Sequence, residues 1–205
     1  MISRARREKE KENMKNAIMD AAIKIIAEEG YEKLSMRKIA DTIEYTPTTI
    51  YSYYKDKSDI VDGISRKIYD KNISDVKAAL DGCGEVSEDK KVDAAFKALL
   101  YSLADCAKMG SAVISSGTRA IFGPSGESIP PEDNGILILN HLLLQGQQKS
   151  IFRKLDENMS WMLVTALIGF ALDAIENQLH IKEEWTHLVE TYVEMLVYGL
   201  LLKNG

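Results

Sequence analysis

The stretch "SMRKIADTIEYTPTTIYSYYKDKSDI" (residues 35–60) contains two short helical patterns that only a few residues separate. In the first, apolar residues recur at helical spacing after Ser35, a residue type that commonly caps a helix. In the second, Thr46 is placed to cap a helix, and Pro47 takes its first position, where a missing N–H costs no hydrogen bond. Two short helices with a very short link are the helix-turn-helix pattern. We expect the second helix to extend to about Tyr54.

The second helix has two faces that differ in chemistry. At 100° per residue, Ile50 and Tyr54 fall on one side, which predicts that both pack inward. The other side carries hydroxyl groups, one aromatic ring and one cation, on Thr48, Tyr51, Ser52 and Lys55. Hydroxyl groups bond phosphate oxygens and base edges, so this face is suited to a nucleic acid. The alternative interpretation is that the tyrosines are ordinary packing residues of a helical bundle.

The flanking sequence also has the helical period and predicts an all-α fold of about nine helices. One apolar stripe covers residues 14–26, and Gly30 is placed to end that helix. Asp56 is placed to cap a helix that runs toward Leu80, with Asp59 three residues on as a short capping box. Further helices are expected at 90–109, 111–121, 136–155, 159–177 and 183–202, and a mobile loop at 122–135.

Charge and composition indicate two parts with different surroundings. Residues 1–57 carry a net charge of +2, and residues 58–205 carry −7, which together give the −5 of the whole chain. We expect an N-terminal arm and helix-turn-helix domain over 1–57, and a regulatory bundle over 58–205. Basic residues near the start, Arg4, Arg6, Arg7 and Lys9, are expected in a flexible arm that could reach a DNA minor groove.

Several classes of protein are disfavoured. No apolar run approaches the ~20 residues of a membrane helix, and the N-terminus lacks the apolar region of a secretory signal. The two cysteines, Cys83 and Cys106, form no CxxC motif, which favours a reduced cytoplasmic protein without a thiolate metal site. The only His/Glu cluster, His180 to His187, falls near an expected helix junction. We therefore expect no enzyme activity, no cofactor and no metal, with a helical-bundle metalloenzyme as the remote alternative.

The segment "AIMDAAIKIIAEEGYEKLSMRKIADTIEYTPTTIYSYYKDKSDIV" resembles the DNA-binding domain of the TetR family of transcriptional regulators. The family pattern is carried by Gly30-Tyr31, Ile39-Ala40, Ile50-Tyr51, Tyr54 and Lys57. The resemblance implies phosphate contacts from Tyr51 and Lys57. It also implies groove contacts for Thr48, Ser52 and Tyr53 and an approach by Arg37, and we add Thr46 to this DNA-binding set.

One position departs from the family pattern. The family turn usually carries a glycine where this chain has Glu44. A positive φ costs a residue with a side chain roughly 1 kcal/mol or more. Either the turn has another shape, or Glu44 carries the strain.

The resemblance implies that the C-terminal bundle pairs two subunits and often encloses a small-molecule pocket. The last two helices are apolar on too many faces for a monomer, so we expect a homodimer through them on a near-palindromic operator. Candidate pocket residues are polar or aromatic residues within apolar runs: Tyr101, Asp105, Met109, His141, Gln145, Trp161 and Thr165. Taken singly, each is also explained as a core residue. We expect a ligand-responsive repressor, and the alternative is a regulator that answers to a protein partner.

Overall fold

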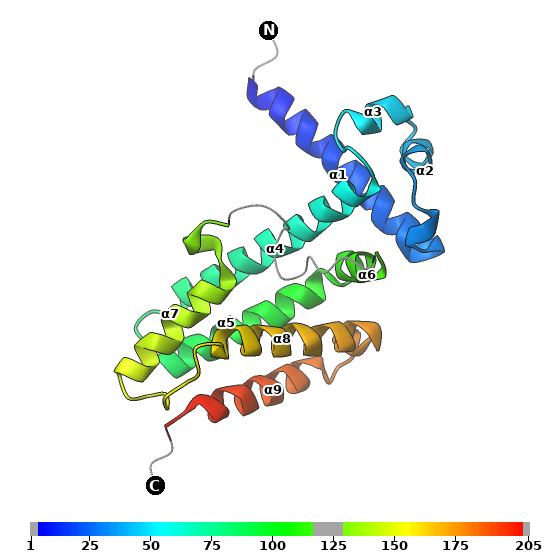
Figure 1. The fold of residues 1–205 in the computed structure, drawn as a ribbon. Coiled ribbons are helices and arrows are strands. Elements are labelled where there is room, and N and C mark those ends of the chain that lie inside the picture. The colour runs from blue at the N-terminus through cyan, green and yellow to red at the C-terminus, as the bar shows by residue number, and fades with distance from the viewer. Residues whose placement is uncertain (1–3, 117–128, 203–205) are drawn as a thin grey trace. The chain divides into compact units, whose positions relative to one another are not determined.

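The computed structural model describes residues 4–116 and 129–202, which form nine α-helices and three short 3-10 helices (Figure 1). The predicted all-α fold is confirmed, and an isolated bridge between Phe152 and Leu201 is the one β pairing within these residues. The chain divides into two compact units, and α4 contributes to both. The described residues 4–69 and 108–116 form the N-terminal unit, and residues 70–107 and 129–202 form the C-terminal unit.

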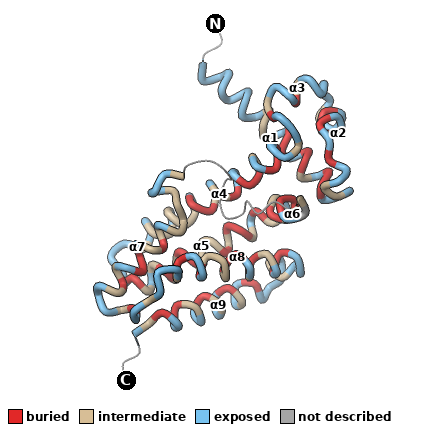
Figure 2. The backbone as a smooth tube through the Cα atoms, viewed as in Figure 1, coloured by how far each residue is buried: buried red, intermediate tan, exposed pale blue. Residues whose placement is uncertain are grey.

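The N-terminal unit is built on two long helices and two short ones. Its elements are α1 (Arg4–Glu29), η1 (Tyr31–Lys33), α2 (Met36–Thr42), α3 (Pro47–Tyr51), the first half of α4 (Lys57–Gly82) and most of α6 (Ala107–Ser115). The side chains that are fully buried in it are Ile18, Ala22, Ile39, Ala40, Ile50, Ile60, Ile64 and Val113. In α1 and α4 the buried residues recur at three- and four-residue spacing, which places them on one side of each helix, and Figure 2 marks the buried positions.

The predicted helix ends are confirmed by their hydrogen bonds. Ser35 accepts a hydrogen bond from the Lys38 amide at 3.2 Å at the start of α2. Gly30 follows α1 with φ 88°, a conformation that costs glycine little. Asp56 accepts from the Asp59 amide at 3.0 Å before α4. The Asp59 carboxylate accepts from the Lys55 amide at 2.8 Å, one residue further back than the capping box that the sequence predicts.

The predicted flexible arm is wrong in the described part of the chain, because α1 begins at Arg4. Arg4 pairs with Glu8 at 3.1 Å and Arg6 pairs with Glu10 at 2.9 Å, both one helical turn apart. Such pairs stabilise an exposed helix by a few tenths of a kcal/mol each. This segment is rich in Arg, Lys and Glu, which are good helix formers, so the helix extends beyond the core.

Three predicted boundaries are also wrong. The helix expected to reach about Tyr54 ends at Tyr51, where the Ser52 hydroxyl donates to the Thr49 carbonyl at 2.6 Å. The helix expected at 90–109 is α5 (Glu88–Asp105), which ends where the Cys106 amide is shared between two carbonyls. The helix expected at 111–121 is α6, which starts at Ala107, and residues 117–121 lie outside the described residues.

The expected loop at 122–135 falls partly outside the described residues, which resume at Ile129. The part that is described contains η3 (Pro131–Asp133), and α7 (Gly135–Gln148) begins at its last position. Asn134 ends this part of the loop because its side chain accepts from the amides of Ile136 and Leu137 at 3.1 and 3.2 Å.

The C-terminal unit is organised around α5. This helix packs against α7, α8 (Met159–Glu176) and α9 (Trp185–Leu200), and η4 (Leu179–Ile181) joins the last two. Fully buried side chains in this unit are Val92, Leu100, Leu167, Val189 and Val193. Within the described chain, α8 alone is long and apolar enough to cross a membrane, with a mean hydropathy of 1.5. Its contacts with α5 and α7 are those of a bundle helix, so this one helix does not indicate a membrane protein.

Helix α7 ends earlier than the predicted residue 155, through a left-handed turn. Ser150 has φ 57°, and the Ile151 amide returns to the Gly146 carbonyl at 2.9 Å. The chain then pairs with the end of α9, because the Arg153 amide donates to the Leu200 carbonyl at 3.0 Å. Phe152 is thereby buried against Gly146.

A buried carboxylate ties α5 to α7. Glu88 is 1% exposed, and the Lys149 ammonium donates to its Oε1 at 2.5 Å. This bond holds the pKa of Glu88 below its usual range even though burial acts in the opposite direction.

Candidate nucleic-acid interface

The turn between α2 and α3 keeps the geometry that normally requires glycine. Glu44 has φ 60°, and the Tyr45 amide donates to the Ala40 carbonyl at 2.9 Å. This is the six-to-one hydrogen bond of a Schellman motif, with Glu44 at the left-handed position. Of the two possibilities that the sequence leaves open, Glu44 therefore carries the strain, and its side chain is exposed.

We expect Glu44→Gly to raise the free energy of unfolding by about 0.5–1 kcal/mol, because the strain outweighs the chain entropy that glycine adds. Urea denaturation followed by circular dichroism measures it. Lys24→Gly is the matched control, because Lys24 is exposed within α1. This variant should lower the free energy of unfolding by about 1 kcal/mol, since glycine is a poor helix former. A Glu44→Gly protein no more stable than the parent would contradict this assignment.

Helix α3 presents one face to the core and the other to solvent. Ile50 is fully buried and Tyr54, three residues after the helix, is also buried, as the sequence predicts. Burial, followed by the nearby charges of Glu12 and Asp59, raises the pKa of Tyr54 to about 12. Tyr51 points outward and is 58% exposed, so the packing interpretation holds for Tyr54 and not for Tyr51.

Several predicted DNA-contacting hydroxyls also organise the local backbone. Thr46 accepts from the Thr49 amide at 3.2 Å, and the two threonine hydroxyls are 3.0 Å apart. The Ser52 hydroxyl uses its proton on the Thr49 carbonyl, which leaves oxygen lone pairs that can accept from base amino groups. Thr48 lies exposed on the same outer side as Tyr51.

The remaining predicted residues lie on α2, in the turn after α3 and at the start of α4. The Arg37 side chain is exposed on α2, 4.0 Å from the Asp41 carboxylate. Tyr53 is half-buried. Lys57, the first residue of α4, is also half-buried, and its ammonium lies 4.1 Å from the centre of the Tyr31 ring. All seven predicted DNA-contacting residues thus belong to the N-terminal unit. We define the α2–α3 surface as these seven: Arg37, Thr46, Thr48, Tyr51, Ser52, Tyr53 and Lys57.

The sequence alone does not predict that Tyr31 contacts Lys57, a member of this surface. Tyr31 and Lys57 are 26 residues apart, and no local pattern pairs them. Tyr45 is exposed at the turn between α2 and α3, and it is not among the predicted DNA-contacting residues. The sequence contains one sign that Tyr45 is unusual, because an aromatic residue occupies a position where the family usually has a smaller apolar one.

The structure distributes the predicted effector-binding residues over four helices. Tyr101 and Asp105 lie on α5, His141 and Gln145 on α7, and Trp161 and Thr165 on α8, whereas Met109 lies on α6 in the N-terminal unit. Asp105, His141 and Trp161 are exposed, and Tyr101, Gln145 and Thr165 are half-buried. A pocket in the C-terminal unit therefore remains a prediction, for which the half-buried three are the better placed.

Some of these side chains have partners within their own unit. Tyr101 meets the Trp185 ring edge-on at 6.5 Å between centroids. His141 and Gln145 are 3.0 Å apart across one turn of α7. The Asp105 carboxylate lies 3.4 Å from the Lys71 ammonium.

Three buried side-chain oxygens in the C-terminal unit have no hydrogen-bond partner among the described residues. They are Oδ1 of Asn72, which is 5% exposed, Oγ1 of Thr165, and Oε2 of Glu88, whose other oxygen accepts from Lys149. A buried acceptor without a partner destabilises a fold, so such atoms are candidates for ligand contacts. Asn72 was not predicted, because it lies in the polar run "DKNISD" that gives no sign of burial.

The described residues contain no group of three or more His, Cys, Asp or Glu side chains that could hold a metal ion. His180 lies in η4, Glu183 and Glu184 lie before α9, and His187 lies within α9, so the members of the His/Glu cluster do not share one helix.

Comparisons with known proteins place the helix-turn-helix segment in a family. Residues 18–64 match the sequence profile of "Bacterial regulatory proteins, tetR family". A 44-residue segment is 46% identical to the fatty acid metabolism regulator protein of Bacillus subtilis, and the match spans 22% of this chain and 23% of that protein. The match to this curated relative therefore covers about a quarter of its length.

Solved structures show the same fold over nearly the whole chain. The fatty acid degradation regulator of Bacillus halodurans aligns with a TM-score of 0.69 and 19% identity, over 89% of this chain and 94% of that one. A TetR-family transcriptional regulator from Haemophilus influenzae aligns with a TM-score of 0.67 and 20% identity, over 94% and 98% of the two chains. At these identities the likeness is one of fold.

Proposed function

This chain belongs to the TetR family of bacterial regulatory proteins, and on that premise we propose that it binds operator DNA through the α2–α3 surface and regulates transcription. The observation that carries the proposal is α3 itself, which buries Ile50 and exposes Thr48 and Tyr51. Regulators of this family bind operator DNA and are generally non-enzymatic. We propose a cytoplasmic location accordingly.

The proposed contacts divide by chemistry. Tyr51 and Lys57 bond phosphates, which supply most of the affinity without reading sequence. Thr48, Ser52 and Tyr53 approach base edges in the major groove, where each base pair presents its own donor and acceptor pattern. In support, Thr48, Tyr51 and Ser52 are exposed on one short segment that the Thr46 cap and the Glu44 turn hold in place.

We expect Tyr51→Ala and Lys57→Ala each to weaken DNA binding by about tenfold or more. The probe is a fluorescent duplex that the parent protein selects from a random library, and fluorescence anisotropy gives the affinity. Lys57→Ala should also lower the salt slope of a dimer by about two, because each subunit loses one cation that neutralises a phosphate, whereas the uncharged Tyr51 should leave the slope unchanged.

Lys24→Ala is the control for those variants, because Lys24 is an exposed lysine on α1 and should leave affinity unchanged. If both Tyr51→Ala and Lys57→Ala bind the duplex as tightly as the parent protein, the two residues do not contact DNA as proposed. If the parent protein enriches no duplex from the library, the proposed DNA-binding function is wrong.

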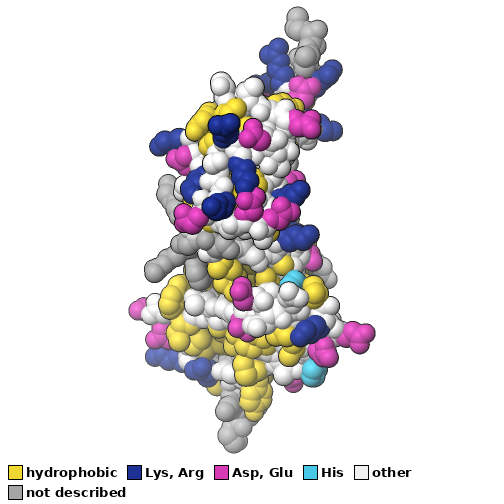
Figure 3. All heavy atoms as spheres, turned by 90° about the vertical axis from the view of Figure 1, so that its right-hand side faces the viewer, with side chains coloured by type: hydrophobic (Ala, Val, Ile, Leu, Met, Phe, Trp, Pro, Cys, Tyr) yellow, Lys and Arg dark blue, Asp and Glu magenta, His cyan; other side chains and the backbone are white. Residues whose placement is uncertain are grey.

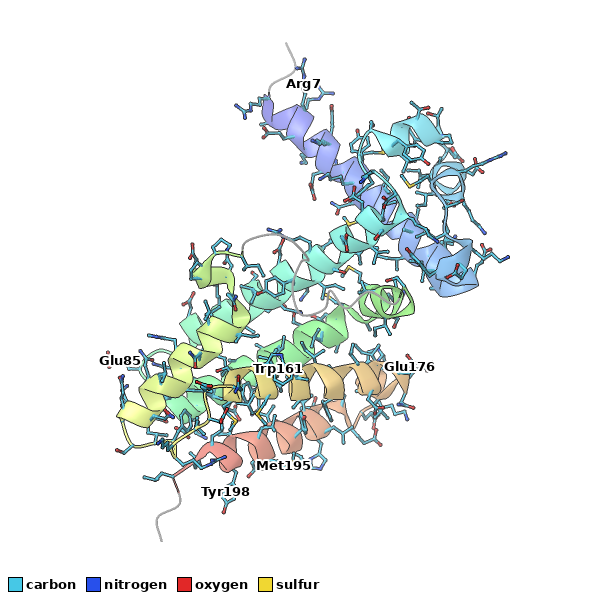
Figure 4. All side chains as sticks on the ribbon, in the orientation of Figure 1. Arg7, Glu85, Trp161, Glu176, Met195 and Tyr198 are labelled. Atoms are coloured by element: carbon cyan, nitrogen blue, oxygen red, sulfur yellow. The ribbon has the colours of Figure 1, made fainter. Side chains whose placement is uncertain are left out.

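We also propose a homodimer formed by the outer sides of α8 and α9. Trp161 and Met162 are exposed on α8, and Met195 and Tyr198 are exposed on α9, with Tyr198 directed away from α8 (Figure 4). Hydrophobic side chains also gather on the surface of the C-terminal unit (Figure 3). Exposed apolar side chains on neighbouring helices suit a self-complementary interface. Such a dimer would offer two α3 helices to half-sites about 34 Å apart on a near-palindromic operator.

For regulation we propose release of DNA by a small molecule that binds in the C-terminal unit. The unpartnered oxygens of Asn72 and Thr165 would accept hydrogen bonds from such an effector. The effector can weaken DNA binding only to the extent that it binds the DNA-free conformation more tightly than the DNA-bound conformation. The rival is control by a protein partner. Calorimetric binding of a small molecule that weakens on Asn72→Leu supports the effector, and no such binding favours the partner.

A further inference from the structure

The Lys57 ammonium is held by Tyr31 from two sides. It lies 4.1 Å from the centre of the aromatic ring, and it donates to the Tyr31 carbonyl at 3.4 Å. The ring face attracts a cation because its quadrupole is negative there. The long carbonyl contact adds direction, and an ammonium has three donors, so two N–H groups remain for other acceptors.

Tyr31 itself is fixed by the turn that ends α1. Gly30 has φ 88° and redirects the chain into η1, whose first residue is Tyr31. The Leu34 amide donates to the Tyr31 carbonyl at 3.0 Å, and the Leu34 side chain is buried. The carbonyl that receives Lys57 therefore belongs to a hydrogen-bonded turn next to the buried Leu34.

This arrangement reduces the conformational entropy that the Lys57 side chain loses when it binds a phosphate. A free lysine side chain gives up about 2 kcal/mol of rotamer entropy when it is immobilised. A lysine already held over a ring has lost part of that freedom in the folded protein, so a phosphate meets a preorganised cation. Neither the ring nor the carbonyl carries a net charge, so the attraction of Lys57 for an anion is retained.

We propose that Tyr31 is a positioning residue for DNA binding, whose ring holds the Lys57 ammonium where a backbone phosphate of the operator meets it. The inference rests on the proposed DNA-binding function. Tyr31 makes no DNA contact of its own and acts through Lys57 alone.

The test is a double-mutant cycle in DNA binding, with the fluorescent duplex selected by the parent protein at about 0.15 M salt. Tyr31→Leu removes the ring face and keeps an apolar side chain, and we expect affinity to fall about tenfold for a dimer with two such pairs. Tyr31→Phe keeps the ring and should bind like the parent protein. In a Lys57→Met background, Tyr31→Leu should have no further effect.

The outcomes separate the inference from the function on which it rests. If Tyr31→Leu weakens binding equally with and without Lys57, the ring has a structural role and the inference is wrong. If Lys57→Met weakens binding and Tyr31→Leu leaves it unchanged, the inference is also wrong, and DNA binding stands. If the parent protein selects no duplex, the proposed function fails first.

A second measurement covers the case in which Tyr31→Leu does not fold. Pentafluorophenylalanine at position 31 keeps the ring's shape and reverses the sign of its face. We expect binding to weaken relative to phenylalanine at the same position, with unchanged circular dichroism. Equal affinity of the two proteins would overturn the role of the ring.

Discussion

Replacing Met195 and Tyr198 by glutamate is expected to reduce the mass in solution from twice 22.9 kDa to 22.9 kDa. The two side chains are 59% and 64% exposed on α9, where Val193 and Val197 are buried on the other side. In a symmetric interface the double variant adds four carboxylates beside Glu190 and Glu194, which are already exposed. Burying unpaired charges destabilises an interface strongly. Light scattering coupled to gel filtration measures the mass.

DNA affinity of the same double variant should fall by about 100-fold or more, because two half-sites no longer bind as one unit. Val86→Glu is the matched control, since Val86 is an exposed apolar residue between α4 and α5. That variant should keep the dimer and the affinity. A parent protein that is already monomeric, or a double variant that remains a dimer, would rule out the α8–α9 interface.

The second large effect is expected at Gly146, where Gly146→Ala should lower the free energy of unfolding by about 3 kcal/mol. A Cβ there would lie 2.1 Å from Cδ2 and 2.3 Å from Cε2 of Phe152. The Phe152 ring is buried, and the pairing of residues 151–153 with the end of α9 limits its movement. The gain of about 1 kcal/mol from alanine in a helix is smaller than this overlap.

Urea denaturation measures this loss, and Gly169→Ala is the control. A Cβ at Gly169, on the exposed side of α8, meets no atom within 4 Å, so that variant should be no less stable than the parent. Phe152→Leu should recover part of the loss when combined with Gly146→Ala, because it removes ring atoms from the overlap. A Gly146→Ala protein as stable as the parent would show that the two segments can separate freely.

Features that depend on neighbours in the chain were predictable. The caps formed by Ser35, Thr46 and Asp56 each join residues three apart, so composition and spacing suffice to place them. The inward side of α3 follows in the same way from the 100° step between Ile50 and its neighbours. The family resemblance lies within this same local segment.

Features that depend on distant residues were not predictable. The Tyr31–Lys57 contact spans 26 residues and the Glu88–Lys149 ion pair spans 61. The expectation of a flexible start was wrong, although the Arg–Glu pairs of α1 are local. A high density of charge is typical of disordered segments, but opposite charges four residues apart favour a helix.

The sequence by itself determined that this chain is all-α and that residues 35–60 form a helix-turn-helix segment, because apolar period, caps and turn act over one or two helical turns. Only the tertiary structure decided that Glu44 takes φ 60°, that Tyr31 holds Lys57, and that α9 leaves Met195 and Tyr198 uncovered. The Glu44 turn is one of two shapes that the sequence leaves open, and the other two features depend on where one element packs against another. Such contacts are determined by the packing of side chains from distant parts of the chain, so a short segment of sequence cannot predict them.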